Sequence, residues 1–315
     1  MTGPAASASG YLDPAYRDSF RPFGDVLTLP ASGLHLLKRP LPGGGHDLAG
    51  LYPYSSLSDW SGLAADIRGL RGTGAVALSL VTDPFQESRA CAALAGWDVS
   101  RPFKTHWIVD LGGDWRARRS RNTRYYAARG LGFQDTAVVD DPTAYAADFW
   151  RLYSAGADRL NMAPMQRLSP QIVARQLALD DAFLTVARRG GELSGAMITM
   201  HSGETAYLHI MGMAAAAARL HTSYALFHTA LAHLETLGCR LVSLGGGAGP
   251  TDDPEDGLYR FKKRWATESR RTWFGGVVLD RAAHAALCAR AGAPDTGYFP
   301  GYRAPGSPFA WRAPV

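Results

Sequence analysis

A lysine on an apolar helical face is the residue whose position most clearly suggests chemistry. Residues 258–265 form a predicted short helix, one face of which carries, at helical spacing, Leu258, Phe261, Lys262 and Trp265. An ammonium group buried without a partner is costly, so Lys262 either extends to water or meets an anionic group. In the second case its charge could stabilise an oxyanion that develops during a reaction.

A glycine-rich segment, SLGGGAGPTDDPEDG, leads into this helix. It is not a P-loop, because the glycines of a P-loop run directly into GK[ST], whereas here an acidic run follows and would repel phosphate. A dinucleotide-binding GxGxxG is disfavoured as well, because Pro250 interrupts the helix that must follow it. We therefore expect Gly245, Gly246 and Gly247 to permit a close approach of the backbone to another group.

The acidic run has two interpretations. Its members could hold a cation or the α-amine of a substrate; they are Asp252, Asp253, Glu255 and Asp256. The simpler interpretation is a solvated turn in which Asp256 caps the N-terminus of the helix.

Neither the histidines nor the cysteines indicate a metal site. Three histidines near one predicted helix lie seven and five residues apart, without the i, i+4 pair and glutamate of HExxH; they are His221, His228 and His233. The three cysteines form no CxxC, which argues against a thiolate zinc site and against a disulfide framework. No metal and no bound cofactor are predicted.

Positive charge is concentrated in two segments. The chain has 33 basic and 28 acidic residues, a formal net charge of +5 and a pI near 9.2. Residues 115–130 hold six arginines and no acid, and residues 258–271 hold six basic residues and one glutamate. Such clusters attract phosphate groups. Two solvated helix faces are the alternative interpretation.

The length and composition indicate a chain that can bury a core. With 315 residues, 46% of them apolar, it can form two ordinary domains or one large domain. No run approaches the ~18 apolar residues of a membrane span, and the N-terminus lacks a basic start followed by an apolar block. We therefore expect a soluble, cytoplasmic protein.

The hydrophobic pattern predicts alternating helices and strands. Strands are expected at 75–81, 105–111, 132–139, 239–244 and 274–280, with an antiparallel meander over 182–213 that turns at two GE dipeptides. Helices are expected at 60–70, 86–94, 143–157, 170–179 and 223–237, in the arginine-rich segment and after residue 280. Residues 1–50 are rich in Pro and Gly, which indicates loops with one or two short strands.

The pattern changes at Asp140-Asp141-Pro142, which predicts a domain boundary. We expect an N-terminal domain over 1–141, a C-terminal domain over 142–290, and a Pro-rich tail over 291–315 that packs back on the first domain.

Several motifs resemble the Fem family of aminoacyl-tRNA-dependent peptidyltransferases, within the GNAT acyltransferase superfamily. The family's glycine cluster and Gly-Leu-x-x-Phe-Lys segment are matched by Gly245 to Gly247, Gly257, Leu258, Phe261 and Lys262. YPYSSL (52–57) is similar to the family's Tyr-Pro-Tyr-Gly-Gly-Pro, with different residues at the last three positions. LVTDPF, THWIVDL and RNTRYYAARGLGF also resemble its N-terminal domain, so the resemblance covers roughly residues 45–285. It implies an α/β (α+β) fold of two tandem GNAT-like domains, with mixed central sheets flanked by helices.

The resemblance also implies transfer of an aminoacyl group from aminoacyl-tRNA to an amine. The donor ester is already activated, so the protein has to align the amine and stabilise the tetrahedral intermediate. Lys262 is the candidate catalytic residue, and no Ser/His/Asp set or carboxylate pair stands out as a general base. The acceptor is expected to be a peptidoglycan precursor or a small molecule of specialised metabolism.

Acetyl-CoA is disfavoured as the donor. GNAT enzymes bind its pyrophosphate on a glycine-containing loop before the long helix, and the corresponding residues 213–226, MAAAAARLHTSYAL, contain no glycine. Acyl transfer from CoA or a carrier protein is the alternative enzymatic reading. A non-catalytic GNAT pair that binds RNA is the alternative outside enzymes.

Two sets of contact residues complete the expected site. The candidate substrate contacts are Tyr52, Tyr54, Lys38, Gly245, Gly246, Gly247, Phe261 and Tyr207. The candidate tRNA contacts are Arg116, Arg119, Arg124, Lys263, Arg264 and Arg270. The aromatic rings over residues 52–60 could instead belong to a core.

Overall fold

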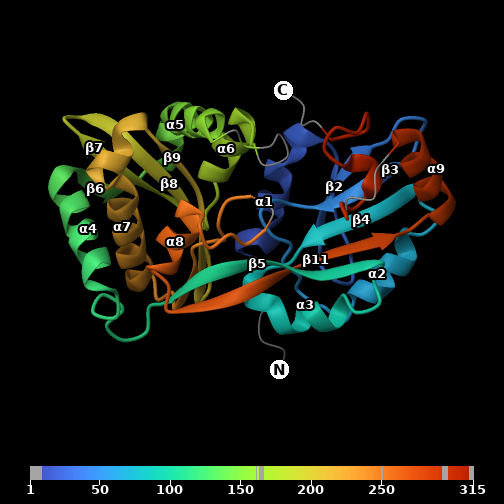
Figure 1. Cartoon of the computed structure of the whole chain (residues 1–315), viewed down its shortest axis with the longest axis horizontal. Helices are drawn as coiled ribbons and strands as arrows, with labels where there is room; N and C mark the ends of the chain where they lie inside the picture. Colours follow the sequence, from blue (N-terminus) through green and yellow to red (C-terminus); the bar gives the residue numbers. More distant parts are fainter. Residues whose placement is uncertain (1–8, 161, 163–166, 250, 293–296, 312–315) are drawn as a thin grey trace. The chain divides into compact units, whose positions relative to one another are not determined.

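The computed structural model describes residues 9–160, 162, 167–249, 251–292 and 297–311. The chain divides into two compact units. Unit 1 contains Ser9, Gly10 and the described residues of 104–270, and unit 2 contains residues 11–103 with the described residues of 271–311. Figure 1 labels the main helices and strands of both units.

The sheet of unit 1 has the strand order β5-β10-β9-β8-β7-β6. Its strands are β5 (Val99–Asp110, from Lys104 onward), β6 (Asp135–Val138), β7 (Ala182–Arg189), β8 (Glu192–Ser202), β9 (Thr205–Met213) and β10 (Leu241–Ser243). The meander β7-β8-β9 is antiparallel, β9 and β10 are parallel, and β10 and β5 are antiparallel. Gly190, Gly191 and Gly203 have positive φ in the two tight turns of the meander, which explains why glycine occupies them.

Helices cover both faces of this sheet. They are α4 (Arg121–Phe133), α5 (Ala146–Arg159), α6 (Pro170–Leu177), α7 (Thr222–Thr236) and α8 (Gly257–Lys263). A Cβ atom on Gly195 would meet Leu226 of α7, and one on Gly212 would meet Leu152 of α5. Gly212 is paired with Ala196, so these two glycines point to opposite faces. Helices α4 and α7 pack together, as Figure 1 also shows.

The core of unit 1 lies between α7 and the sheet. It includes Trp107 and Val109 of β5, Leu226 and Leu231 of α7, and Trp265 directly after α8. The C-terminal end of α8 is therefore anchored in the core, so the position of Lys262 is tied to the packing of the sheet.

The sheet of unit 2 has the strand order β1-β2-β3-β4-β11. Its strands are β1 (Val26–Thr28), β2 (His35–Pro40), β3 (His46–Gly50), β4 (Ala75–Val81) and β11 (Glu268–Val278, from Arg271 onward). Its helices are α1 (Pro14–Ser19), α2 (Leu63–Leu70), α3 (Glu87–Ala93) and α9 (Arg281–Ala291). Leucines of β2, β3, β4 and α2 form its main core.

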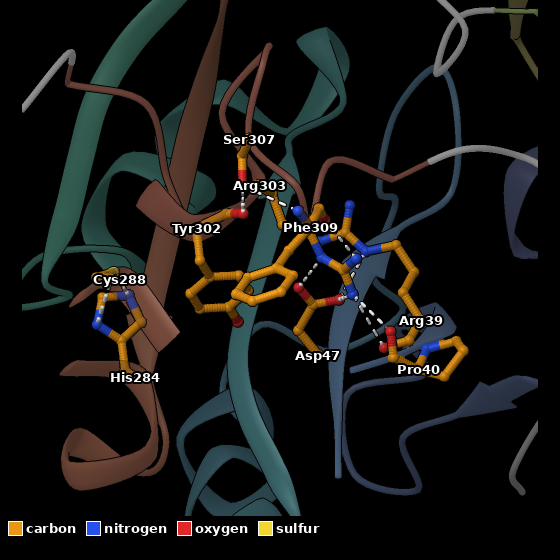
Figure 2. Close-up of polar contacts among 9 residues, drawn as sticks. All are labelled: Arg39, Pro40, Asp47, His284, Cys288, Tyr302, Arg303, Ser307 and Phe309. Carbon is orange, nitrogen blue, oxygen red and sulfur yellow. Dashed lines mark hydrogen bonds and ion pairs between the residues drawn. The ribbon is translucent and has the colours of Figure 1, made fainter. Parts of the chain in front are cut away.

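A buried ionic cluster joins the C-terminal segment to the β2-β3 hairpin of unit 2 (Figure 2). The carboxylate of Asp47 accepts hydrogen bonds from Nε of Arg39 at 2.7 Å and from Nε of Arg303 at 2.9 Å. The guanidinium of Arg303 also donates to the carbonyl oxygens of Pro40 at 2.9 Å and Phe309 at 2.8 Å. All three charged side chains are almost completely buried. We call these three residues the Asp47 cluster.

The described part of the Pro-rich tail, residues 297–311, thus packs within unit 2. The ring of Tyr302 is buried with Leu41, Val76 and Leu287. The remainder of the expected tail after residue 292, namely residues 293–296 and 312–315, lies outside the described residues.

The predicted fold class is confirmed: the protein is an α/β protein with mixed sheets flanked by helices. The compact units differ from the boundary expected at residue 141. Residues 104–141 belong with 142–160 and 167–270, because β5 pairs with β10 and α4 packs on α7. Residues 271–278 of β11 instead belong with unit 2, where β11 pairs with β4. Among the described residues, no helix combines the length and hydropathy needed to span a membrane.

Candidate functional site

The glycine loop, residues 244–249, follows β10 and meets α8 at Lys262. The Nζ atom of Lys262 donates to the carbonyl oxygen of Gly246 at 2.9 Å. The carboxylate of Asp256 caps α8 by accepting from the backbone N–H of Tyr259 at 2.8 Å, which confirms the predicted N-cap. The same carboxylate accepts from the N–H of Ala248 at 2.9 Å. The loop and the helix are therefore tied together at both the cap and the lysine.

A second lysine, Lys104 of β5, reaches the same loop. Its Nζ atom donates to the carbonyl oxygens of Gly247, of Ala248 at 3.3 Å and of Gly249 at 2.7 Å. Two lysine side chains from different elements thus bind the adjacent carbonyls of Gly246 and Gly247. Lys104 is absent from the residues predicted from the sequence. The available signal was its two-residue separation from His106, because alternate residues of a strand share a face.

The glycines are required by close contacts. A Cβ atom on Gly246 would lie 3.1 Å from Cε of Lys104 and 3.5 Å from Nε2 of His106. A Cβ atom on Gly247 would lie 2.9 Å from Oδ2 of Asp256 and 3.0 Å from Cβ of Tyr259. Gly245 adopts a φ of +80°, which disfavours other residues. The close approach predicted from the sequence is thus an approach of the glycine backbone to side chains of this site.

Burial and a neighbouring charge alter the titration of Lys262. Burial, and to a smaller extent the positive charge of Lys104, lower the pKa of its amine to about 7, while Asp256 acts in the opposite direction. The pKa of Lys104 is also lowered by burial, against the opposing influence of Asp252 and Asp256. Burial lowers the pKa of His106 to about 3, so this imidazole is neutral at physiological pH. At neutral pH the amine of Lys262 can therefore accept a proton and then carry a positive charge.

The remaining predicted contacts in unit 1 are Phe261 and Tyr207. The ring of Phe261 packs at 4.9 Å from the rings of both Tyr224 and Phe227, so it secures α8 to α7. Tyr207 is buried in β9, paired in register with Ser243 at the end of β10. Both residues support the loop and helix that carry Lys262.

Lys38, Tyr52 and Tyr54 belong to unit 2. Lys38 lies in β2, paired with Leu48 of β3. The carbonyl oxygen of Tyr52 accepts a hydrogen bond from the hydroxyl of Tyr16, and the buried ring of Tyr54 lies 5.6 Å from that of Tyr11. These contacts match the core-packing alternative for the segment, and a substrate role for the three residues stays a prediction.

Two of the predicted tRNA-binding arginines lie against aromatic rings of unit 1. Arg119 is buried, with its guanidinium carbon 4.5 Å from the ring centroid of Trp115 and 4.8 Å from that of Trp265. Arg116 stacks on Trp115 and forms an ion pair with Glu235. We correct the expectation for Arg119 in particular: a guanidinium enclosed between two indole rings is not on a surface that a phosphate can reach.

The other predicted tRNA contacts have more exposed positions. Arg124 donates to the carbonyl oxygens of Ala117 at 2.8 Å and of Arg119 at 2.9 Å. Lys263 and Arg264 are exposed at the end of α8, and Lys263 also lies over the ring of Trp107. Arg270 is paired with Glu268.

The segment that corresponds to the pyrophosphate-binding loop of CoA-dependent GNAT enzymes packs against the end of α4. A 3₁₀ helix, Ala215–Leu220, precedes α7 here. The side chain of Gln134, at the end of α4, donates to the carbonyl oxygen of Leu220 at 3.0 Å and accepts from the hydroxyl of Thr222 at 2.8 Å. A Cβ atom on Gly130 of α4 would lie 2.7 Å from the carbonyl oxygen of His221. The end of α4 therefore packs against the residues that precede and begin α7.

No cluster of three or more His, Cys, Asp and Glu side chains that could hold a metal ion exists among the described residues. The three histidines near α7 have separate surroundings: the ring of His221 contacts that of Phe133, His228 contacts Trp115, and His233 contacts Phe183.

Residues 114–263 match the model of the acetyltransferase (GNAT) domain. This part of the chain is therefore similar to a GNAT acetyltransferase domain. The matched GNAT residues include the glycine loop, α8 and Lys262. Lys104 lies outside the matched range.

Three solved structures share the fold over most of the chain. FemX is 12% identical, with 87% of this chain and 93% of FemX covered and a TM-score of 0.63. The C-terminal domain of a protein described as a lysylphosphatidylglycerol synthetase from Agrobacterium fabrum is 17% identical. The match covers 96% of this chain and 95% of that domain, with a TM-score of 0.59. L-PGS from Bacillus licheniformis is 14% identical. The match covers 89% of this chain and 95% of L-PGS, with a TM-score of 0.55. These identities establish a shared fold alone. No curated protein matches the chain in sequence.

Proposed function

We propose that the protein transfers an aminoacyl group from an aminoacyl-tRNA to an amine acceptor and forms an amide bond. The observation that carries the proposal is the amine of Lys262, with its pKa near 7, held against the glycine loop of a GNAT domain. An amine that titrates near neutral pH suits a reaction in which a proton leaves the nucleophile and later reaches the leaving group.

The glycine-free segment before α7, which packs against the end of α4, supports a donor other than acyl-CoA. In CoA-dependent GNAT enzymes this helix end and its glycine loop bind pyrophosphate through backbone N–H groups. Here Gln134 and the backbone around Gly130 pack against Leu220, His221 and Thr222. The fold shared with FemX and with the lysylphosphatidylglycerol synthetase domain supports an aminoacyl donor. Because charged tRNA is a cytoplasmic substrate, the proposal also places the reaction in the cytoplasm.

The proposed reaction balances through one proton relay. The nitrogen of the acceptor attacks the ester carbonyl carbon, and neutral Lys262 takes the proton that this nitrogen loses. The resulting ammonium stabilises the negative charge on the tetrahedral oxygen. The carbonyl re-forms, the bond to the terminal ribose oxygen breaks, and Lys262 returns the proton to that oxygen. The amide product, the free tRNA and the neutral lysine result.

The acceptor in this proposal is an amine, on either a peptidoglycan precursor or a small molecule of specialised metabolism. Both provide the nucleophilic nitrogen that the reaction needs. Lys38, Tyr52 and Tyr54 stay proposed substrate contacts, in unit 2.

A transfer assay tests the proposal directly. Purified protein is incubated with bacterial tRNA charged with radiolabelled amino acids, with a bacterial extract as acceptor source, with and without prior ribonuclease treatment. We expect label to move from tRNA into an acid-soluble, ribonuclease-stable product, and ribonuclease pretreatment to abolish the movement. Consumption of acetyl-CoA with the same extract, without movement of label, would show a conventional GNAT acyltransferase instead.

Lys262→Ala separates an enzyme from an RNA-binding protein. We expect this variant to bind charged tRNA with unchanged affinity and to lose label transfer. Arg260→Ala, which removes an exposed basic side chain from the same helix, is expected to retain transfer. If the unmodified protein binds tRNA as tightly as Lys262→Ala does and also transfers no label, the result favours the non-catalytic alternative.

A further inference from the structure

Two aromatic side chains of α4 are partly exposed to solvent. Tyr125 is 52% exposed and Phe133 is 37% exposed. Arg129 lies between them, with its guanidinium carbon 5.7 Å from the ring centroid of Tyr125 and 5.1 Å from that of Phe133. Its Nη1 atom donates to the hydroxyl of Tyr125 at 3.0 Å. Residues four apart lie on one side of a helix, so the three side chains form a stripe about 12 Å long.

The opposite face of α4 is fixed in unit 1. Ala127 and Gly130 are buried against α7. The hydroxyl of Thr123 donates to the carbonyl oxygen of Arg264, which follows α8. The stripe therefore stands on a helix that packing holds in place.

Ring contacts connect this stripe to the helix of Lys262. The ring of Tyr125 lies 5.4 Å from that of Tyr126, and the ring of Tyr126 lies 5.4 Å from that of Tyr224. Tyr224 in turn lies 4.9 Å from Phe261, the residue before Lys262. The stripe and the candidate catalytic lysine thus belong to one packed region of unit 1.

The chemistry of the stripe fits unpaired nucleotides. Aromatic rings and planar guanidinium groups stack on nucleobases, and arginine adds attraction to the phosphates. A duplex keeps its bases stacked inside, so exposed rings are better suited to a single strand. Arg121 is exposed one turn before Tyr125 and extends the positive charge along the same stripe. The segment from residue 115 to 130 contains no acid that would repel a phosphate backbone.

We propose that Tyr125, Arg129 and Phe133 form a stacking platform for the unpaired 3′ end of the donor tRNA. The inference rests on the proposed function, because it assigns a surface to the donor of that reaction. It also assigns recognition of the RNA to residues other than the buried Arg119, which the charge pattern alone had favoured.

Binding of a short RNA tests the platform without any transfer reaction. The probe is a 5′-fluorescein-labelled 12-nucleotide single strand ending in ACCA, and affinity is measured by fluorescence anisotropy at fixed salt. Stacking contributes ~1–3 kcal/mol per base, so we expect Tyr125→Ala and Phe133→Ala each to weaken binding by about 5- to 150-fold. Tyr125→Phe keeps the ring and is expected to bind as the unmodified protein does.

Two controls separate stacking from charge and from misfolding. Tyr145→Ala removes another tyrosine that stacks with an arginine, Arg188, and is expected to leave RNA affinity unchanged. A probe of equal length with abasic sites in place of the last four bases keeps every phosphate and is expected to bind more weakly. Equal affinity for intact and abasic probes, or unchanged affinity in a folded Tyr125→Ala protein, would overturn the proposal.

The outcomes also distinguish the platform from the proposed function. If label moves from tRNA while Tyr125→Ala binds RNA normally and has an unchanged KM for tRNA, the transfer reaction stands and the platform fails. If RNA binding depends on Tyr125 and no label moves, the platform stands and the transfer reaction fails. Binding of an acidic protein in place of RNA would contradict the platform.

Discussion

The amine of Lys262 and the ammonium of Lys104 bind adjacent carbonyls of one loop. This arrangement keeps two basic groups close together at partly buried positions. Its consequence is that the protonation state of Lys262 depends on its neighbours rather than on the residue type alone.

The pH dependence of turnover distinguishes two roles for Lys262. Its pKa is lowered to about 7, so the neutral form prevails above that pH and the protonated form below it. If Lys262 acts first as a base, kcat/KM for aminoacyl transfer rises with pH through about 7 and then levels off. We expect this rise, measured with a fixed acceptor between pH 5.5 and 8.5. A fall in kcat/KM over the same range would instead assign the protonated amine as the starting form.

Lys104→Met should move that pH profile to higher pH. Burial is the main cause of the lowered pKa of Lys262 and the charge of Lys104 is the next, so removing this charge while keeping an apolar side chain raises the pKa. The other groups facing Lys262 are Asp256 and the neutral His106, and both are unchanged in this variant. Lys263→Met removes the same charge from an exposed position and should leave the midpoint where it is. A midpoint unmoved in Lys104→Met would show that burial alone sets the pKa.

Arg119 illustrates a residue role that charge patterns miss. Its guanidinium lies between Trp115 and Trp265, and a lysine ammonium cannot stack on both rings in the same way. We expect Arg119→Lys to lower the free energy of unfolding by ~1–2 kcal/mol, measured by urea denaturation. Arg121→Lys, on the exposed side of α4, should change it by less than ~0.5 kcal/mol. Equal stability of the two variants would contradict a structural role for Arg119.

The sequence could not have distinguished Arg119 from its neighbours. WRARRSR offers several arginines within one turn of one another, and the partner ring of Trp265 lies far along the chain. Lys262 was predictable, because its helical spacing with Leu258, Phe261 and Trp265 is local. The position of Lys104 beside the glycine loop is harder to predict, because it arises from the pairing of β5 with the distant strand β10.

At the scale of elements, the glycine loop packs closely against the first turn of α8. A side chain on Gly247 would lie against Asp256 and Tyr259, the groups that cap and begin the helix. We expect Gly247→Ala to lower kcat for transfer by at least about 10-fold while the protein stays folded, because displacement of the helix by about 1 Å misplaces Lys262. Gly257→Ala is the matched control, since a Cβ atom there meets nothing within 4 Å. Similar kcat values in both variants would argue against a catalytic loop.

Strands that a local residue pattern marks in the sequence were predicted close to their observed bounds. Strands that depend on pairing with other segments were predicted less well. The strand at 75–81 and the meander match β4 and β7 to β9, because apolar runs and glycine turns mark them in the sequence. The first 50 residues contain β1, β2 and β3, more strands than expected. Their Pro and Gly content resembles loop composition, and their strand conformation is stabilised by ladders that end on β4.

At the scale of the whole chain, the Asp47 cluster joins residues that are far apart in sequence. One carboxylate neutralises part of the charge of two buried guanidinium groups, from Arg39 and Arg303. We expect Asp47→Asn to lower the free energy of unfolding by ~3–5 kcal/mol, because it leaves both guanidiniums buried without a counter-charge. Asp148→Asn breaks an exposed pair with Arg151 and should have little effect. Chemical denaturation monitored by circular dichroism compares the two, and equal midpoints would contradict the role of the cluster.

The division of the chain was the least predictable property. The change in pattern at residues 140–142 is real in the sequence, yet β5 and α4, which precede it, pack with the strands and helices that follow. Strand pairing over more than a hundred residues leaves no local mark, so composition alone does not indicate this division into compact units.

The lowered pKa of Lys262 also makes this residue chemically distinct among the few amines of the protein. The sequence contains only four lysines: Lys38, Lys104, Lys262 and Lys263. Only a neutral amine attacks an activated ester, and at pH 7 roughly half of the Lys262 side chains are neutral, against fewer than about one in a thousand for an ordinary lysine. A small amine-reactive ester that reaches the glycine loop should therefore modify this position ahead of an ordinary lysine. The extent of that labelling would count the correctly folded sites in a preparation before any substrate has been found.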